Sequence, residues 1–232
     1  MLTTLPRTPQ PRAHAAPTPR RPLPEKARCR GGCSWMLDGV PEAVAEAFVA
    51  RCRRVRYAAG ETVFHEGDPA FGVYLVCSGR VKRTKRTAGG KRIILEVAGP
   101  GEALGLESAF GQGAYAASAE ALEATTLHFV DRQTLRGLFQ QAPEAAVRAS
   151  ERLARALAQA QARLLEATYA GSMEKLSHVL LALAGRFGVP ARADGRDGVA
   201  LGLALSRGEL AELAGLTPAP TLRLQSRPRR RT

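Results

Sequence analysis

The chain has 232 residues, and its 45% hydrophobic and 24% charged residues are typical of a globular protein with one large or two small domains. The 34 Lys and Arg residues exceed the 21 Asp and Glu residues by 13, a surplus that favours a polyanionic partner, either nucleic acid or an anionic membrane. No apolar run approaches the roughly 18–20 residues that cross a bilayer, and the amino terminus lacks the apolar stretch of a secretory signal. We therefore expect a cytoplasmic protein without a membrane partner.

Residues 1–28 form a basic, proline-rich segment. They hold seven of the fifteen prolines and six Lys or Arg residues against one acid, Glu25. Proline removes backbone donors and the segment has no apolar periodicity, so a disordered, solvated tail is predicted. An accessory DNA-binding arm and a mis-assigned start codon are the alternatives.

Residues 29–142 are expected to form a domain built on a small antiparallel β-roll. Within this domain, an amphipathic helix is predicted before the strands, over residues 36–54, with Pro41 near its start. After that helix the hydrophobic period changes to two, in short segments bounded by Gly, Pro or Asp. Many short strands that are separated by turns, with no helix between them, indicate an antiparallel barrel or roll. The predicted strands are Thr62–Phe64, Val73–Cys77, Val81–Arg86, Ile93–Val97 and Thr125–Val130.

A helical period returns at residues 143–170, which contain no Gly or Pro after Pro143. Small and apolar residues advance there by steps of four and three, as in the heptad seam of a coiled coil. At 1.5 Å per residue the helix would be roughly 40 Å long, too long for a roll of about 100 residues to cover. We expect this helix to pair with its copy in a homodimer; the alternative is a helix that lies on its own domain. The seam positions are Ala146, Ser150, Leu153, Leu157, Ala160, Leu164, Ala167 and Gly171.

Residues 171–232 begin with a second predicted helix, which runs to Phe187 and has Ser172 as its expected N-cap. A Gly-, Asp- and Arg-rich loop is predicted over residues 188–198. An apolar alternating run, Val199–Leu205, follows that loop.

A short capped helix comes next. Ser206 and Glu209 have the spacing of a capping box, in which each side chain satisfies a backbone amide of the other residue. This helix is predicted to end at Gly215, and Leu216-Thr217 would begin another helix. A helix, a tight glycine turn and a further helix form the helix-turn-helix arrangement of DNA-binding proteins.

Four motifs occur in a fixed order along this chain. Their glycines lie where strands reverse and the backbone needs a positive φ. The motifs are Gly60-x3-Phe64-x2-Gly67-Asp68, Tyr74-Leu75-Val76-x2-Gly79-x-Val81-Lys82, Gly101-Glu102-x2-Gly105 and Leu205-Ser206-Arg207-x-Glu209-Leu210-Ala211-x2-Ala214-Gly215. In this order, and together with the long helix, they resemble the Crp/Fnr family of bacterial transcription regulators over residues 36–217.

The resemblance implies an α+β protein of three parts. It implies a cyclic-nucleotide-binding-like β-roll that senses a small effector in residues 29–142, a dimerisation helix at 143–170 and a winged helix-turn-helix in residues 171–232. DNA is then the expected partner of a homodimer, and RNA polymerase is a candidate further partner. The competing hypothesis is an effector-sensing or protein-interaction module whose DNA-binding part has decayed.

The segment that supplies the effector pocket in the family departs from its cyclic-AMP-binding members. Those members place a glutamate and an arginine where this chain has Leu106 and Ala116, and no Lys, Arg or His occurs over residues 99–118. A buried phosphodiester without a cation would cost several kcal/mol, about the penalty of an unpaired buried charge, so cyclic AMP is disfavoured. Backbone amides of the glycine turns could still hold another ligand. The pocket candidates are Gly101, Glu102, Gly105, Leu106, Glu107, Tyr115, Ala116 and Ala117.

The expected recognition helix also departs from the family pattern. Where the family has a glutamate and arginines that read bases, residues 217–223 read Thr-Pro-Ala-Pro-Thr-Leu-Arg, and only Arg223 matches. The following Arg- and Pro-rich residues leave no hairpin wing, which indicates a frameshift or truncation after residue 217, or else an inert basic tail. The DNA-binding candidates are Ser206, Arg207, Thr217, Arg223 and Arg227.

The four cysteines have no recognised metal-binding spacing. Cys29 and Cys33 precede the roll, while Cys52 and Cys77 follow singly. Fnr-type proteins hold an iron–sulfur cluster with clustered cysteines, of which this chain has two where three would be expected, so inert thiols are preferred over a cluster or a Cys29–Cys33 redox pair. No nucleophile–base pair or nucleotide-binding loop is present, so we expect neither an enzyme nor a required cofactor.

Overall fold

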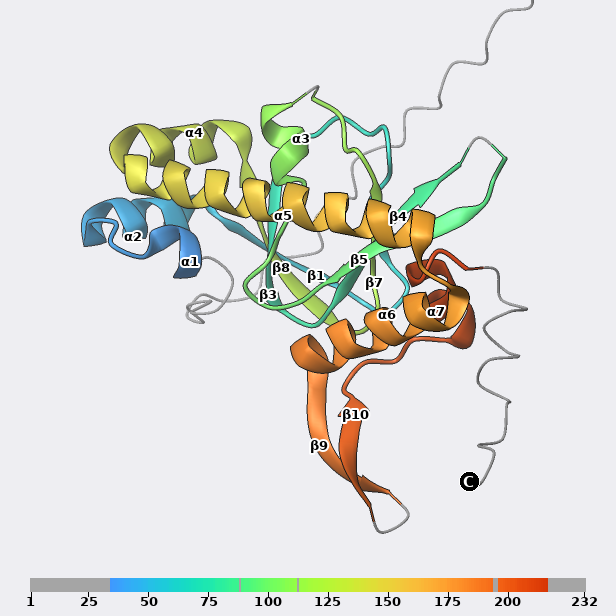
Figure 1. Cartoon of the computed structure of the whole chain (residues 1–232). Helices are drawn as coiled ribbons and strands as arrows, with labels where there is room; N and C mark the ends of the chain where they lie inside the picture. The colour runs from blue at the N-terminus through green and yellow to red at the C-terminus, as the bar shows by residue number, and fades with distance from the viewer. Residues whose placement is uncertain (1–33, 88, 112, 194–195, 217–232) are drawn as a thin grey trace, which may run out of the picture.

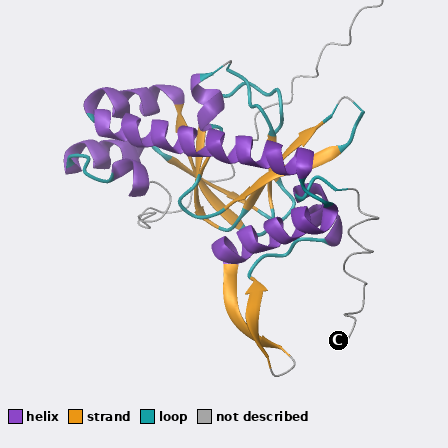
Figure 2. Cartoon of the chain, viewed as in Figure 1, coloured by secondary structure: helices purple, strands orange, loops and turns teal. Residues whose placement is uncertain are grey.

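A computed structural model describes residues 34–87, 89–111, 113–193 and 196–216 of the chain, so the predictions for residues 1–33 and 217–232 fall outside it. The described part contains antiparallel sheets and helices, which confirms the α+β prediction (Figures 1 and 2). Two short helices come first, followed by a β-roll, a long helix and a carboxyl-terminal unit. We call that last unit, residues 171–216, the head.

The β-roll consists of two four-stranded antiparallel sheets. One sheet has the strand order β1-β8-β3-β6 and the other has the order β2-β7-β4-β5. The strands are Arg53–Tyr57 (β1), Thr62–Phe64 (β2), Gly72–Ser78 (β3), Val81–Arg86 (β4), Arg92–Ala98 (β5), Ala103–Leu104 (β6), Ser118–Ala121 (β7) and Thr125–Asp131 (β8).

The five strands predicted from the sequence are present as β2, β3, β4, β5 and β8, each within one residue of its expected bounds. Three strands escaped the prediction for different reasons. The edge strand β1 is mostly arginine, β6 has two residues, and β7 consists of Ser, Ala and Glu, which are not typical strand formers.

Two apolar clusters form the core of this part of the molecule. One lies between the sheets and includes Val81, Leu104 and Leu127, all fully buried. The other joins Leu75 and Val130 of the roll to the helices that cover one end of it. Burial of this kind removes apolar surface from water and is the main contribution to folding.

The covering helices are α1 (Ser34–Leu37), α2 (Glu42–Arg51) and α4 (Arg132–Gln141). The single helix predicted over residues 36–54 is wrong: Pro41 is the N-cap of α2, and the chain enters β1 at Arg53. The sequence analysis missed α4, which begins at a cap in which the Asp131 carboxylate accepts a hydrogen bond from the Thr134 amide at 2.8 Å.

The long helix, α5 (Pro143–Tyr169), has the predicted length, with Pro143 in its first turn. Its first half packs on α1 and α4, where Ala145 and Ala149 are buried. Its second half extends past the covering helices towards the head (Figure 1).

The head contains α6 (Ser172–Phe187), the hairpin β9 (Gly188–Ala193) and β10 (Arg196–Leu201), and α7 (Arg207–Leu213). Two predictions are corrected here. Gly171, rather than Ser172, is the N-cap of α6, and the loop predicted over residues 188–198 belongs to an antiparallel hairpin. The predicted capping box of Ser206 and Glu209 is confirmed at the start of α7.

Candidate effector site and DNA-binding head

The segment expected to hold the effector turns sharply between β6 and the short helix α3 (Leu106–Phe110). Gly105 occupies this turn with φ +79°, in the left-handed region that favours glycine. A Cβ at this position would lie 2.6 Å from a ring carbon of Tyr115, so only glycine lets the turn approach that ring. The glycine motif therefore fixes how α3 meets the tyrosine.

Tyr115 is a buried polar residue of this segment. Its hydroxyl donates a hydrogen bond to the Gly72 carbonyl at 2.9 Å, and its ring stacks on Phe64 with centroids 3.8 Å apart. Burial raises the pKa of the phenol well above its usual value, and the hydroxyl keeps its proton as a donor. The hydrogen bond from Tyr115 to Gly72 thus anchors the segment to β3.

The other predicted pocket residues separate into two groups. Leu106 and Ala117 are buried, while Ala116 is exposed and its backbone amide donates a hydrogen bond to the Ser108 hydroxyl oxygen at 3.1 Å. Gly101 and Glu102 lie elsewhere, because the Glu102 carboxylate pairs with Arg186 of the head at 2.5 Å. The structure therefore places these two residues at the junction of roll and head.

Sequence reasoning missed a cation that reaches this segment from β4. Arg83 shares a strand face with the buried Val81, and its guanidinium pairs with Glu96 at 2.8 Å and with Glu107 of α3. The absence of cations within residues 99–118 is thus an incomplete argument against an anionic ligand. The alternation of side chains between the two faces of β4 was the available signal in the sequence, since it places Arg83 on the same face as the buried Val81.

A second cation, Lys85, also approaches this segment. Its ammonium donates to the Ala116 carbonyl at 3.1 Å and lies 3.4 Å from the carboxylate of Glu66. Arg83 and Lys85 are thus both already close to a carboxylate or a carbonyl. An anionic ligand would have to compete with these contacts.

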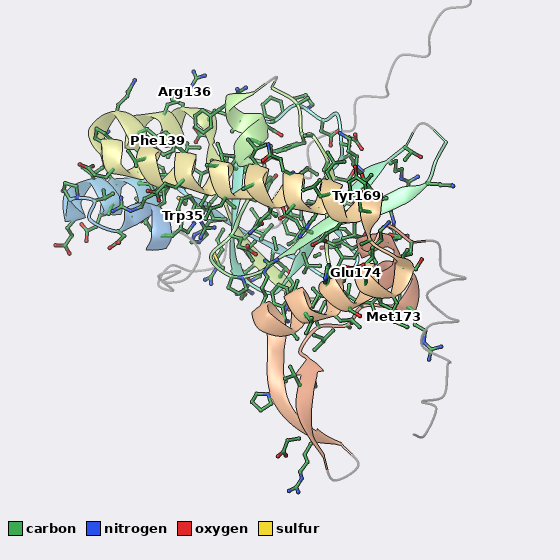
Figure 3. All side chains as sticks on the ribbon, in the orientation of Figure 1. Trp35, Arg136, Phe139, Tyr169, Met173 and Glu174 are labelled. Atoms are coloured by element: carbon green, nitrogen blue, oxygen red, sulfur yellow. The ribbon has the colours of Figure 1, made fainter. Side chains whose placement is uncertain are left out.

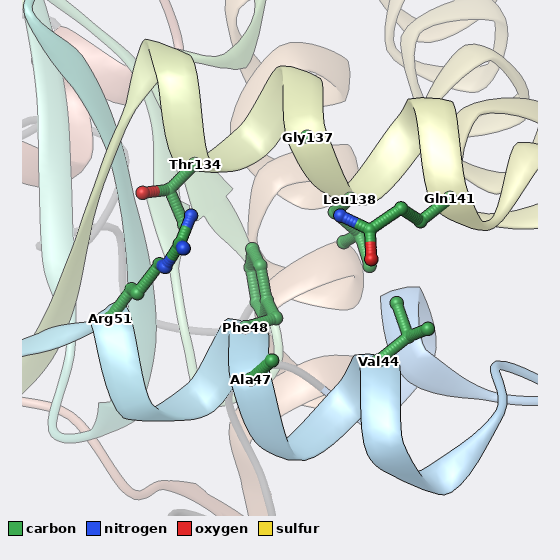
Figure 4. Close-up of a pocket in the computed structure, with 8 residues that line it drawn as sticks. All are labelled: Val44, Ala47, Phe48, Arg51, Thr134, Gly137, Leu138 and Gln141. Carbon is green, nitrogen blue, oxygen red and sulfur yellow. The ribbon is translucent and has the colours of Figure 1, made fainter.

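A small cavity of about 130 Å³ lies between α2 and α4, away from this segment (Figure 4). It is lined by Phe48, Leu138, Thr134 and Arg51, among others. A water molecule takes about 30 Å³ of liquid volume, so the cavity holds a few waters but no nucleotide. It is therefore not a second effector pocket.

The head presents two of the predicted DNA-binding residues. Ser206 and Arg207, at the amino-terminal end of α7, are exposed. Thr217, Arg223 and Arg227 lie outside the described residues. The exposed pair is therefore the part of the DNA-binding prediction that the structure places on a surface.

The helix α7 also docks on the roll, through a network of charges. Lys82 of β4 has a side chain only 5% exposed, and its ammonium lies 2.7 Å from the carboxylates of both Glu209 and Glu120. Arg92 of β5 pairs with Glu212 at 2.9 Å. The first turns of α7 are thus held on the sheet that contains β4 and β5.

The titration of the network follows from these contacts. Burial alone would lower the pKa of Lys82, but hydrogen bonds to Glu120 and Glu209 outweigh it and raise that pKa. Burial would raise the pKa of Glu209, and the hydrogen bonds from Lys82 and Ser206 hold it below its usual value instead. Lys82 and Glu209 are therefore both charged at neutral pH.

The second half of α5 presents an apolar face to solvent. Of the predicted seam, Leu153 is half-buried against the helical core cluster, whereas Leu157 and Leu164 are 61% and 68% exposed. Tyr169, at the end of α5, and Met173, in the first turn of α6, are also exposed (Figure 3). Exposed apolar residues in such a row mark an interaction surface.

Metal-binding and membrane-spanning features are not found in the described residues. That part of the chain has no group of three His, Cys, Asp or Glu side chains that could hold a metal ion, and Cys29 and Cys33 lie outside it. The Cys52 thiol donates to the Phe48 carbonyl at 3.3 Å. None of the described helices has the length and apolar character needed to cross a membrane.

The chain is similar to known proteins over most of its length. Residues 54–142 match the cyclic nucleotide-binding domain family. The chain is 29% identical over 182 residues to the CRP-like cAMP-activated global transcriptional regulator of Mycobacterium tuberculosis, covering 78% of this chain and 79% of that protein. It is 31% identical over 150 residues to the cyclic AMP receptor protein of Thermus thermophilus, covering 65% and 69% respectively.

A solved structure shows the same arrangement. FixK2 from Bradyrhizobium japonicum aligns with a TM-score of 0.64 and 26% sequence identity, over 75% of this chain and 83% of that one. The likeness thus extends beyond the β-roll, since the matching domain family covers only residues 54–142.

Proposed function

Because this chain belongs to the Crp/Fnr family of transcription regulators, we propose that it binds DNA as a homodimer and senses a small signal in its β-roll. RNA polymerase is a further partner under this proposal. The relatives named above are regulators of transcription, and one of them is named for its activation by cyclic AMP.

The observation that carries the proposal is the apolar face on the second half of α5. Leu157 and Leu164 are seven residues apart, so they lie on one side of the helix and would meet a second copy. A homodimer would cover this face and bring two heads together, as a two-fold symmetric DNA site requires.

The dimer can be tested with Leu157→Glu, which places a charge in the proposed interface of both protomers. Sedimentation velocity should show a shift from dimer to monomer. Val199→Glu is the matched control, because Val199 is equally exposed at 60% but lies on the hairpin of the head. A Leu157→Glu protein that stays dimeric would place the interface elsewhere.

DNA binding can be tested by selection from a random duplex pool, followed by titration of the selected DNA against a scrambled duplex. The usual base-reading side chains are absent from residues 217–220, so we expect steep salt dependence with poor sequence preference. A palindromic site bound hundreds of times more tightly than the scramble would contradict that expectation. No binding to any DNA would support the decayed-head hypothesis instead.

Cyclic AMP is expected to bind weakly. Arg83 is a cation that reaches the expected pocket, and Glu96 and Glu107 already neutralise it. A cyclic phosphate would have to displace a carboxylate and leave it without its partner, which costs about 1–3 kcal/mol or more. Isothermal titration calorimetry tests this, and micromolar affinity for cyclic AMP would contradict it.

A further inference from the structure

The β4–β5 hairpin carries an unusual concentration of positive charge. Residues 82–92 contain six Lys or Arg residues and no acid. Four of the six are paired with carboxylates from other elements, as described above for Lys82, Arg83, Lys85 and Arg92. The other two, Arg86 and Lys91, lie at the end of the hairpin, which we call the basic tip.

The side chains of the basic tip are exposed and form no ion pair with the described residues. Arg86 and Lys91 are both exposed, while the Glu66 carboxylate accepts a hydrogen bond from the Arg86 backbone amide at 3.4 Å. The strands pair Arg86 with Arg92, so the tip lies directly beyond the residue that binds Glu212. Its charge is therefore available to a partner.

The hairpin and α7 are held in a fixed register. Glu209 binds Lys82 near the base of the hairpin, and Glu212 binds Arg92 near the tip. The helix α7 thus runs from the base of the hairpin towards its tip. The hairpin projects from the roll on the side where α7 packs (Figure 1).

We propose that the basic tip contacts the phosphate backbone of DNA bound by the head. This inference rests on the proposed DNA-binding function and adds a contact that lies in the roll rather than in the head. Phosphate contacts need only a positioned positive charge, and the ion pairs of Lys82 and Arg92 position this one relative to α7.

The chemistry of the tip favours DNA over an acidic protein surface. Protein interfaces depend on buried aromatic or large apolar anchors. The turn between Arg86 and Lys91 reads Thr-Ala-Gly-Gly, which supplies no such anchor. Two exposed cations on a glycine turn are suited to a polyphosphate backbone.

The test uses the full-length double variant Arg86→Gln/Lys91→Gln. Its matched control is Arg56→Gln/Arg136→Gln, which removes the same charge from exposed positions on β1 and α4; Arg136 lies at the far end of the molecule from α7 (Figure 3). Both variants change exposed residues, and equal circular dichroism spectra and thermal midpoints would verify their folding.

Affinity for a DNA duplex is measured by fluorescence anisotropy at several salt concentrations. Each phosphate contact contributes about 0.9 to the slope of log K against log salt, so two contacts per protomer contribute about 3.6 in a dimer. Raising the salt concentration from 50 to 200 mM should weaken DNA binding by both proteins. The loss of affinity should be on the order of 100-fold smaller for the tip variant than for the unmodified protein. The control should keep the original slope.

The outcomes separate the two proposals. If the unmodified protein binds DNA and the tip variant has the slope of the control, the basic tip makes no phosphate contact and this inference is wrong, while the proposed function stands. If the unmodified protein binds no DNA, both are wrong. A tip variant with an unchanged DNA slope but weakened binding to purified RNA polymerase would assign the tip to a protein partner and also overturn the inference.

Discussion

The β-roll and its junction with the head are held together by different forces. Within the roll, two apolar clusters contain twelve buried residues each among the described residues. At the junction, three buried residues, Val97 of the roll and Leu183 and Phe187 of the head, form a smaller cluster, on which seven partly buried apolar residues pack. Ion pairs of Lys82, Arg92 and Arg186 surround it.

This difference indicates separate roles for the two regions. A close-packed apolar core has one preferred arrangement, and it resists changes in salt and pH. Charged contacts weaken with salt and depend on protonation, so a junction built on them responds to its surroundings. The roll therefore forms the stable frame, and the position of the head is the adjustable part.

The largest effect is expected from a cavity in the roll. Leu127 is fully buried between the sheets, and Leu127→Ala should lower the free energy of unfolding by about 2–5 kcal/mol. Trp35, the single tryptophan, packs against the helical core cluster and reports unfolding of the roll in urea by its fluorescence. Leu181→Ala, at a position 70% exposed on α6, should leave the midpoint nearly unchanged.

A smaller effect is expected at the junction. Lys82→Met leaves Glu209 and Glu120 without their shared cation, which should weaken the docking of α7 by about 1–3 kcal/mol. Circular dichroism should then show the helices of the head unfolding at lower urea than the Trp35 signal. Lys85→Met makes the same chemical change at a half-exposed position, and an equal effect of the two variants would contradict the role of Lys82.

The second ion pair of the junction should contribute less. Arg92 and Glu212 are 33% and 23% exposed, so solvent screens their attraction and Glu212→Gln should cost less than about 1 kcal/mol. For a chain of this size, the thermal midpoint should then fall by less than about 4 °C. A larger fall would mean that the pair acts with Lys82 as one network.

The smallest effect concerns pH. Burial, together with nearby Arg54, lowers the pKa of His128 in β8 below its usual value of 6.5. The unfolded chain takes up the proton first, so the stability of the roll should fall as pH drops below about 6.5. Glu209 has a lowered pKa, so its contribution is present above about 4.5 and is lost only at more acidic pH.

Unfolding in urea between about pH 7.5 and 5.5 separates the two contributions, because the carboxylate of Glu209 stays charged over that range. His128→Gln should flatten the pH dependence of the Trp35 transition. An unchanged slope would show that another group is responsible.

Sequence patterns predicted the elements that depend on features close together along the chain. Alternation and glycine turns located β2, β3, β4, β5 and β8, and the heptad steps located α5. The capping box located α7, because that motif is satisfied within four residues.

Prediction from the sequence failed for contacts between residues that are distant along the chain. Arg83 meets Glu107 from 24 residues away, and Lys82 meets Glu209 from 127 residues away. No local pattern distinguishes such a lysine from a solvated one. The hairpin of β9 and β10 was missed because Gly and Pro inside it are typical of loops.

Ion pairs help to hold the head on the β-roll, whereas buried apolar clusters stabilise the β-roll itself. Hydrogen exchange of the unmodified protein at low and high salt tests it most directly, with the amides of α7 compared with those of β3 and β8. We expect α7 to lose protection as salt rises while β3 and β8 keep theirs, because screening weakens ion pairs and leaves apolar burial intact. Equal behaviour of α7 and the roll strands at both salt concentrations would contradict the claim.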